Sequence, residues 1–432
     1  MIEAPQSTAA DREDGEFVHV GFRWSFCLIV SLFLLWALAN NLNDVLVRQF
    51  QKSLGLNRAQ AGFIQFVFYI GYFVVALPAG LLMRKLGYKA GIILGLGLYA
   101  IGALLFYPAS LALRFDMFLF ALFVIAAGAA CLETAANAYI GFFGSRATAV
   151  QRLNLAQAFN GLGGCVAPAI GGMVIFSGVE YGADTLAAMS PAQLASYRMT
   201  EAATVQMPYM LLALASLIIG IAVYLAKMPS VKDAQVAPLR QQMKTLWESR
   251  ALKGAVAAQF FYVGAQVGIW SFFIDFVKDS LPWLTERQAA FLLSGSLILF
   301  MVGRFSGTIL MTRIRPCALL GCCAVANILL CGLAALCSNW LAVSALVLTS
   351  FFMSIMFPTI FAMGVANLGA ARPLGSSMII MAVIGGAILP PIMGFVGVTW
   401  GSIAPAMMLP GLCFVIIAIY AQRTMLTRHP IP

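Results

Sequence analysis

Long apolar runs constrain the fold of this chain more than any other feature. Twelve stretches approach the roughly 20 apolar residues that a helix needs to cross the hydrocarbon core of a bilayer. Hydrophobic residues make up 62% of the chain and charged residues only 10%, which a soluble protein could not accommodate. The sequence therefore predicts an all-α polytopic membrane protein with twelve transmembrane helices. The expected spans are 24–47, 60–83, 90–108, 117–143, 153–176, 205–226, 255–277, 289–311, 317–337, 341–365, 376–398 and 404–421.

The distribution of Lys and Arg predicts the orientation of these spans. With the first residue in the cytoplasm, 18 of these cations fall on the cytoplasmic side and seven on the outer side, while Arg304 lies inside a span. Because positive charge accumulates in cytoplasmic loops, both termini are expected in the cytoplasm. The first 22 residues are acidic and lack the apolar segment of a signal peptide, so we expect a disordered cytoplasmic tail.

The chain divides into two related halves. Gly163-Gly164 and Pro168 of the fifth span recur as Gly-Gly and Pro 222 positions later, in the eleventh span. Parallel repeats of this kind are typical of transporters built from two six-helix halves. The expected parts are a tail at 1–22, an N-terminal half at 23–227, a basic cytoplasmic linker at 228–253 and a C-terminal half at 254–432.

Two short connecting segments carry local signals. A cytoplasmic turn after the second span combines small residues with cations that can interact with helix C-termini, and it is echoed after the eighth span. On the outer side, Ser190-Pro191-Ala-Gln193 predicts a short capped helix. The residues of the cytoplasmic turn are Gly80, Arg84, Lys85, Gly87 and Lys89.

Two acidic residues inside apolar spans are candidate proton-coupling groups. They are Asp44 in the first span and Glu133 in the fourth. A carboxylate removed from water binds a proton more readily, so such a group can take up and release one near working pH. Structural alternatives stay open: Asp44 lies near the outer end of its span and can pair with Arg48, and Glu133 can pair with Arg304.

Polar side chains recur at helical spacing on four spans and favour a polar central cavity. Interhelical hydrogen bonding is the alternative for each of them taken singly. The stripes are Trp36, Asn40, Asn41, Asn43 and Asp44 in the first span, Glu133 and Asn137 in the fourth, Gln157, Asn160, Gly164 and Pro168 in the fifth, and Gln259, Tyr262, Gln266 and Trp270 in the seventh.

This mixture of groups suits a sugar. Amides and carboxylates bind hydroxyl groups, and an aromatic ring stacks on the apolar face of a sugar ring. A cationic drug would need more acidic residues, and an organic anion would need a buried arginine. Arg304 is the candidate for that role, but its expected place near the cytoplasmic end of the eighth span favours a structural ion pair.

Other functional classes lack their signatures. His19 and His429 lie in the tails, and the cysteines lie mostly within apolar runs without metal-ligand spacing, so no metal or other cofactor is expected. No pairing of nucleophile and base marks an enzyme. No basic stripe with interleaved aromatic residues marks a nucleic-acid-binding protein. A non-transporting membrane sugar sensor remains the alternative from a different class.

Five segments of the chain resemble a known family of transporters. They are similar to bacterial fucose permeases, the L-fucose/proton symporters of the fucose/galactose/glucose branch of the major facilitator superfamily. The likeness extends from about residue 24 to residue 421. The segments are 36–44, 131–137, 152–160, 259–266 and 358–361.

The resemblance implies two rocking halves around a central sugar site, with proton coupling through Asp44 and Glu133. Those two carboxylates are also expected to contact the sugar. The other residues expected at the sugar site are Trp36, Asn41, Asn137, Gln157, Asn160, Trp270 and Phe357.

The chain also departs from this family at three positions. Family members carry Tyr where Phe357 stands and Arg where Asp275 stands, and they lack a basic residue at the position of Arg48. The hydroxyl lost at Phe357 bears on which sugar is bound. L-Fucose is the leading candidate substrate. A glucose or galactose transporter, coupled to protons or to sodium, is the alternative among sugar transporters.

These observations predict a secondary active transporter, and not an enzyme, in the inner membrane of a bacterium. It would import a monosaccharide together with a proton by alternating access. The expected partners are the sugar, the proton as coupling ion and the lipid bilayer, without nucleic acid, and the expected unit is a monomer.

Overall fold

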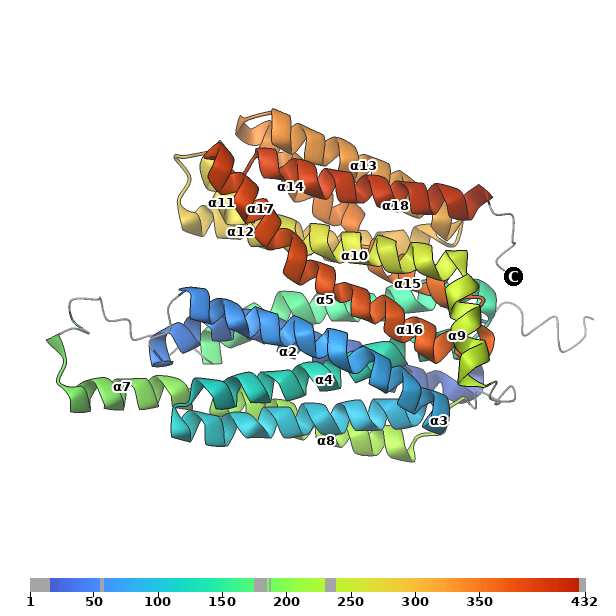
Figure 1. Cartoon of the computed structure of the whole chain (residues 1–432), viewed down its shortest axis with the longest axis horizontal. Coiled ribbons are helices and arrows are strands. Elements are labelled where there is room, and N and C mark those ends of the chain that lie inside the picture. The colour runs from blue at the N-terminus through green and yellow to red at the C-terminus, as the bar shows by residue number, and fades with distance from the viewer. Residues whose placement is uncertain (1–15, 55–57, 175–184, 186–187, 230–237, 427–432) are drawn as a thin grey trace, which may run out of the picture.

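The computed structural model describes residues 16–54, 58–174, 185, 188–229 and 238–426, which form helices and no strand. Helices of the first part of the chain (blue to green) and of the second part (yellow to red) form two groups that lie against each other (Figure 1). The α-helices are α2 (Arg23–Leu54), α3 (Arg58–Ala112), α4 (Phe115–Tyr139), α5 (Ala149–Val174), α7 (Pro191–Ala203), α8 (Gln206–Leu225), α9 (Leu239–Glu248), α10 (Arg250–Ser271), α11 (Phe273–Ser280), α12 (Glu286–Leu310), α13 (Pro316–Leu336), α14 (Asn339–Met353), α15 (Met356–Val365), α16 (Arg372–Met381), α17 (Gly385–Trp400) and α18 (Met408–Leu426). The 3-10 helices are η1 (Val20–Phe22), η2 (Ile140–Phe142), η3 (Arg146–Thr148), η4 (Gly369–Ala371), η5 (Ala382–Ile384) and η6 (Pro405–Met407).

The expected spans fall on these helices, although some are merged or divided. α3 carries two of them on either side of Gly87, and the seventh span is the pair α10–α11, bent by 52°. The tenth span divides into α14 and α15, and the eleventh into α16 and α17. Among the described residues, nine helices, or ten if the bent pair is one span, are long and apolar enough to cross a membrane. The long α3 is a single one of these nine.

The repeated glycines pack equivalent helices together in the two halves. A Cβ atom on Gly163 of α5 would lie 2.9 Å from the carbonyl oxygen of Leu34 in α2. A Cβ atom on Gly385 of α17 would collide with the carbonyl oxygen of Phe260 in α10. Because only glycine permits such close backbone contact, the fifth and eleventh spans pack on the first and seventh in the same way.

The turn inside α3 has the geometry that its sequence predicts. Gly87 adopts φ 81° and ψ 170°, a backbone conformation that residues with a side chain rarely adopt. Two residues later, the Lys89 ammonium group donates to the carbonyl oxygens of Tyr224 (2.8 Å) and Ala226 (3.0 Å). A cation of the turn therefore binds the C-terminal end of α8, as expected from the helix dipole.

Two surface helices complete the bundle. α7 begins with the predicted capping box, in which the Gln193 amide N–H donates to the Ser190 hydroxyl and the Ser190 amide N–H donates to the Gln193 side chain. α9 lies within the expected linker at 228–253, for which the sequence predicts no helix. α9 and the C-terminal end of α18 lie at one end of the bundle and α7 at the other (Figure 1). We call the end with α9 the basic end.

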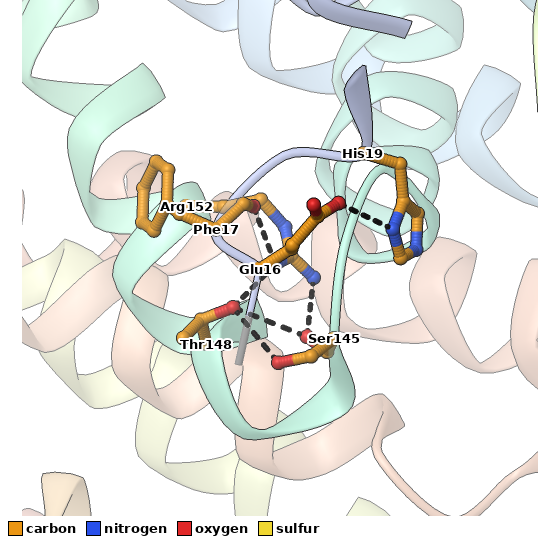
Figure 2. A network of polar contacts seen from close by, with 6 residues as sticks. All are labelled: Glu16, Phe17, His19, Ser145, Thr148 and Arg152. Carbon is orange, nitrogen blue, oxygen red and sulfur yellow. Dashed lines mark hydrogen bonds and ion pairs between the residues drawn. The ribbon is translucent and has the colours of Figure 1, made fainter. Parts of the chain in front are cut away.

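The first described residues pack on the loop between α4 and α5 (Figure 2). Arg152, which is fully buried, donates to the carbonyl oxygens of Phe17 (2.9 Å) and Ser145 (2.7 Å). The backbone N–H of Ser145 donates to the carbonyl oxygen of Glu16 (3.1 Å), and that of His19 donates to Phe143. This network anchors the N-terminal segment to the first half of the bundle.

Candidate functional site

A cavity of about 900 Å³ lies between the two halves of the bundle. Its walls come from α2, α3, α4 and α5 on one side and from α10, α12, α15 and α17 on the other. Asn137 does not line this cavity, and the side chain of Asp44, a residue of α2, lies outside the described part of the structure. The other seven predicted residues line it: Trp36, Asn41, Glu133, Gln157, Asn160, Trp270 and Phe357.

Glu133 is held by residues from two neighbouring helices. It is 8% exposed and forms a hydrogen bond with the Tyr72 side chain of α3. The Asn40 amide of α2 donates to the same Tyr72 hydroxyl oxygen over 3.2 Å. Because that oxygen accepts from Asn40, the hydroxyl proton can point to the carboxylate. The arrangement fixes an ionisable group at the cavity wall, where a proton can be bound and released.

Gln157 lines the cavity and is hydrogen-bonded to Asn137 of α4. Its Nε2 donates to the Asn137 Oδ1 atom over 3.0 Å, so Asn137 lies behind Gln157 and not at the cavity, where the sequence predicts it. Asn137 follows Glu133 by one helical turn, but the Gln157 side chain stands between it and the cavity. Helical spacing places both residues on one face and cannot show that a neighbouring helix covers one of them.

Arg304, for which the sequence favours a structural ion pair, donates hydrogen bonds to neutral oxygens. Its guanidinium donates to the main-chain oxygen of Gln157, to the Gln157 Oε1 atom (3.4 Å) and to the main-chain oxygen of Ser354 (2.8 Å). It also stacks on the Phe300 ring, 4.5 Å from the ring centroid. Among the described residues no ion pair joins it to Glu133. Neutral acceptors and an aromatic ring satisfy a cation that lines the cavity and is 3% exposed.

Trp36 of the first half and Trp270 of the second half line the cavity with aromatic rings. The Trp270 indole N–H donates to the Ser350 hydroxyl over 3.0 Å, and its ring meets Phe300 edge-on at 5.1 Å. Trp36 is only 1% exposed and packs on Phe33 at 4.3 Å. The Trp270 ring is therefore fixed in orientation before any ligand binds, which lowers the entropic cost of stacking on it.

The asparagines present amide groups at the cavity. Asn41 donates to the carbonyl oxygen of Ala37 (2.8 Å), and Asn160 donates to that of Phe33 (3.3 Å). Each amide is thereby oriented by a neighbouring backbone, and its oxygen is available as an acceptor for a hydroxyl group. Gly164 lies beside Asn41, where a Cβ atom would come within 3.4 Å of that amide.

Sequence reasoning missed the contribution of α3. Phe66, Tyr69 and Tyr72 all line the cavity, and they stand three residues apart in a strongly apolar span. That spacing puts them on one helix face. Tyrosines on one face of an apolar helix are the sequence signal that could have identified α3 as part of the cavity wall.

The comparisons with known proteins agree with this architecture. The sequence pattern of the Major Facilitator Superfamily matches residues 25–378. The L-fucose-proton symporter of Escherichia coli (strain K12) is 42% identical over 427 residues, which cover 98% of this chain and 97% of that protein. The glucose/galactose transporter of Brucella abortus (strain 2308) is 37% identical over 393 residues, covering 91% and 92%.

Solved structures show the same fold. The crystal structure of the transporter FucP in the outward conformation superposes with a TM-score of 0.87 at 43% identity, covering 94% of this chain and 99% of that one. The proton:xylose symporter XylE, at 13% identity and a TM-score of 0.70, shares the fold alone. The chain therefore belongs to the major facilitator superfamily, and the relatives named above are membrane transporters and not enzymes.

Proposed function

We propose that the protein imports a monosaccharide, with L-fucose the leading candidate, together with a proton by alternating access. The observation that carries this proposal is the central cavity, which joins amides and tryptophans from both halves to one buried carboxylate. The full-length similarity to an L-fucose-proton symporter supports the same substrate and coupling ion.

The cavity supplies complementary contacts for a sugar. Asn41, Gln157 and Asn160 offer amides from one half, and Trp270 offers a fixed ring from the other. Hydroxyl groups of the sugar would bind the amides while its apolar face stacks on the indole. A sugar bound in this way contacts both halves at once, which is the requirement for coupling its binding to their movement.

Glu133 is the proposed proton carrier. Its hydrogen bond with Tyr72 and its small exposure allow both the charged and the neutral state to exist at the cavity wall. Asp44 remains a second proposed carrier on the sequence argument alone. No metal or organic cofactor is needed for this chemistry.

The orientation and division of the chain complete the proposal. Positive charge at the basic end supports a cytoplasmic location of that end and of both termini, in a bacterial inner membrane. The two halves would be residues 23–227 and 254–432, joined by the linker at 228–253, with 1–22 as a cytoplasmic tail. Each monomer would transport independently.

Counterflow in proteoliposomes tests the function directly. Vesicles containing the purified protein are loaded with unlabelled L-fucose and diluted into a trace of labelled L-fucose. A carrier gives a transient accumulation of label, whereas a sensor or an enzyme does not. Absence of counterflow with L-fucose and with other hexoses would refute the proposal.

Glucose or galactose is a second candidate substrate. Phe357 lines the cavity where fucose permeases carry Tyr, so one hydroxyl partner for the sugar is absent. The 37% identity to a glucose/galactose transporter also favours this alternative. Competition of labelled L-fucose uptake by galactose, glucose and arabinose, with and without sodium, distinguishes the two candidates and their coupling ions.

A further inference from the structure

A second cavity, of about 730 Å³, lies at the basic end of the bundle. Four cationic residues line it, and none of the described residues in its wall is acidic. Like charges around one cavity repel one another, so an anion that enters the cavity is stabilised by them. The four cations are Arg84, Lys89, Arg146 and Arg372.

Arg372 is the cation with the clearest capacity for a ligand. Its guanidinium stacks on the Phe142 ring at 4.5 Å, and its buried Nε atom has no hydrogen-bond partner among the described residues. Arg146, whose side chain is exposed, lies close enough for its charge to act on Arg372. The nearby Arg152 differs, because five hydrogen bonds to protein oxygens already satisfy its guanidinium.

A buried neutral donor meets the same cavity. Asn137 is 1% exposed and lines this space, and its Oδ1 atom accepts from Gln157. Its Nδ2 atom has no hydrogen-bond partner within the described residues. A buried N–H group without an acceptor is costly, so an acceptor atom inside the cavity would stabilise the site.

We propose that the cavity at the basic end binds an anion that carries a phosphate group. Guanidinium groups bind phosphate oxygens through paired N–H donors. Arg372 lies over the Phe142 ring, and its Nε atom has no hydrogen-bond partner among the described residues. Tyr88 and Tyr139 stack at 5.5 Å and form an aromatic wall for an organic portion of the ligand. This site is distinct from the central cavity and is not required by the proposed sugar transport.

The site lies between the two halves of the chain. Arg146 and Arg84 belong to the first half of the chain, and Arg372 belongs to the second. An anion bound between them ties the halves together at the basic end and opposes their separation there. A soluble phosphate ester and the headgroup of an anionic lipid share this chemistry.

Thermal unfolding of the full-length protein in phosphatidylcholine nanodiscs tests the proposal without a transport assay. Inorganic phosphate is titrated at constant ionic strength into the wild type, Arg372→Gln, Arg146→Gln and the control Arg250→Gln. Arg250 is an exposed cation near the same end that does not line the cavity. We expect a saturable rise in Tm for the wild type and the control, and at least a fivefold weaker apparent affinity for both cavity variants.

The comparison of variants is needed because phosphate stabilises proteins generally by exclusion from their surfaces. An equal response of all four proteins, or no response, would overturn the site. Because Arg146 is exposed, its variant keeps the test valid if Arg372→Gln fails to fold. A second arm replaces phosphate with phosphatidylglycerol discs: variant-sensitive stabilisation there supports the site with a lipid headgroup, and variant-sensitive stabilisation by free phosphate supports it with a soluble ester.

The chain's own acidic residues are a competing occupant. The backbone carbonyl oxygen of Glu16 accepts from the backbone N–H of Ser145, next to Arg146 in the sequence. Asp11, Glu13 and Asp14 precede Glu16 in the sequence. The titration is repeated on the triple variant Asp11→Asn, Glu13→Asn, Asp14→Asn. Unchanged phosphate affinity supports the proposal. A phosphate response found only in this variant overturns it, because it would show that the acidic tail occupies the cavity of the wild type.

Discussion

Glu133 is buried in the first half of the bundle and lines the central cavity, and it is the proposed proton carrier. We expect Glu133→Gln to lower proton-driven accumulation of sugar at least tenfold, because the amide cannot exchange a proton. Counterflow should partly survive, since exchange needs no net change in protonation. Both assays use the same proteoliposomes. Full active accumulation by the variant would remove Glu133 from the proposed proton path.

The ring of Trp270 is expected to contribute stacking energy to sugar binding. Trp270→Ala should weaken sugar affinity by about 2- to 10-fold, corresponding to roughly 0.5–1.5 kcal/mol for an aromatic contact. Trp270→Phe should retain most of the affinity, although it loses the bond to Ser350. Binding is measured by isothermal titration with the purified protein. Equal loss in both variants would show that the hydrogen bond, and not the ring face, matters.

The sequence predicted the single residues of the site better than their partners. Trp36, Gln157 and Asn160 stand out because polar or aromatic groups at helical spacing are conspicuous in apolar spans, and all three line the cavity. The contacts of Arg304 with Gln157 and of Tyr72 with Glu133 join residues on different helices that are far apart in the sequence. Periodicity within one helix carries no information about such pairs.

At the scale of helices, the repeated glycines set how closely equivalent spans approach. Gly385→Ala should destabilise the protein by about 1–3 kcal/mol, because the new methyl group meets the Phe260 carbonyl oxygen and cannot be accommodated without a backbone shift. Gly97→Ala is the matched control, since a Cβ atom there has no neighbour within 4 Å. Thermal unfolding in detergent should show a clear fall in Tm for the first variant and none for the second.

The length of the apolar runs predicts where the helices lie, but it does not predict where a helix bends or divides. The bend between α10 and α11 and the division of the eleventh span at η5 occur within runs that look continuous in the sequence. Apolar length does not predict α9, because its buried and exposed positions each mix polar and apolar residues. Gln242 and Leu246 are buried, while Leu239 and Trp247 are exposed. Such a helix is short and polar on average, so apolar length does not detect it.

At the scale of the whole molecule, α5 joins the two halves toward the basic end. Gln151 donates to the Met311 carbonyl oxygen over 3.0 Å, Asn154 approaches Thr359 at 3.5 Å, and Gln157 accepts from Arg304. Farther along the same helix, Asn160 and Gly164 line the central cavity. One helix thus carries both the proposed sugar contacts and the bonds that close the basic end, so sugar binding at Gln157 can alter the closure.

Arg304 is the residue through which this coupling can be tested. Arg304→Gln should free Gln157 from the second half and loosen the basic end, so hydrogen exchange of the peptides covering α16 and the end of α4 should become faster, by at least threefold. Arg315→Gln, an exposed cation at the same end, should leave those rates unchanged because it makes no such contact. Added sugar should slow the exchange less in Arg304→Gln than in the wild type, since only the wild type can transmit binding at Gln157 across the halves. Identical exchange in all three proteins would show that the halves are held together without Arg304.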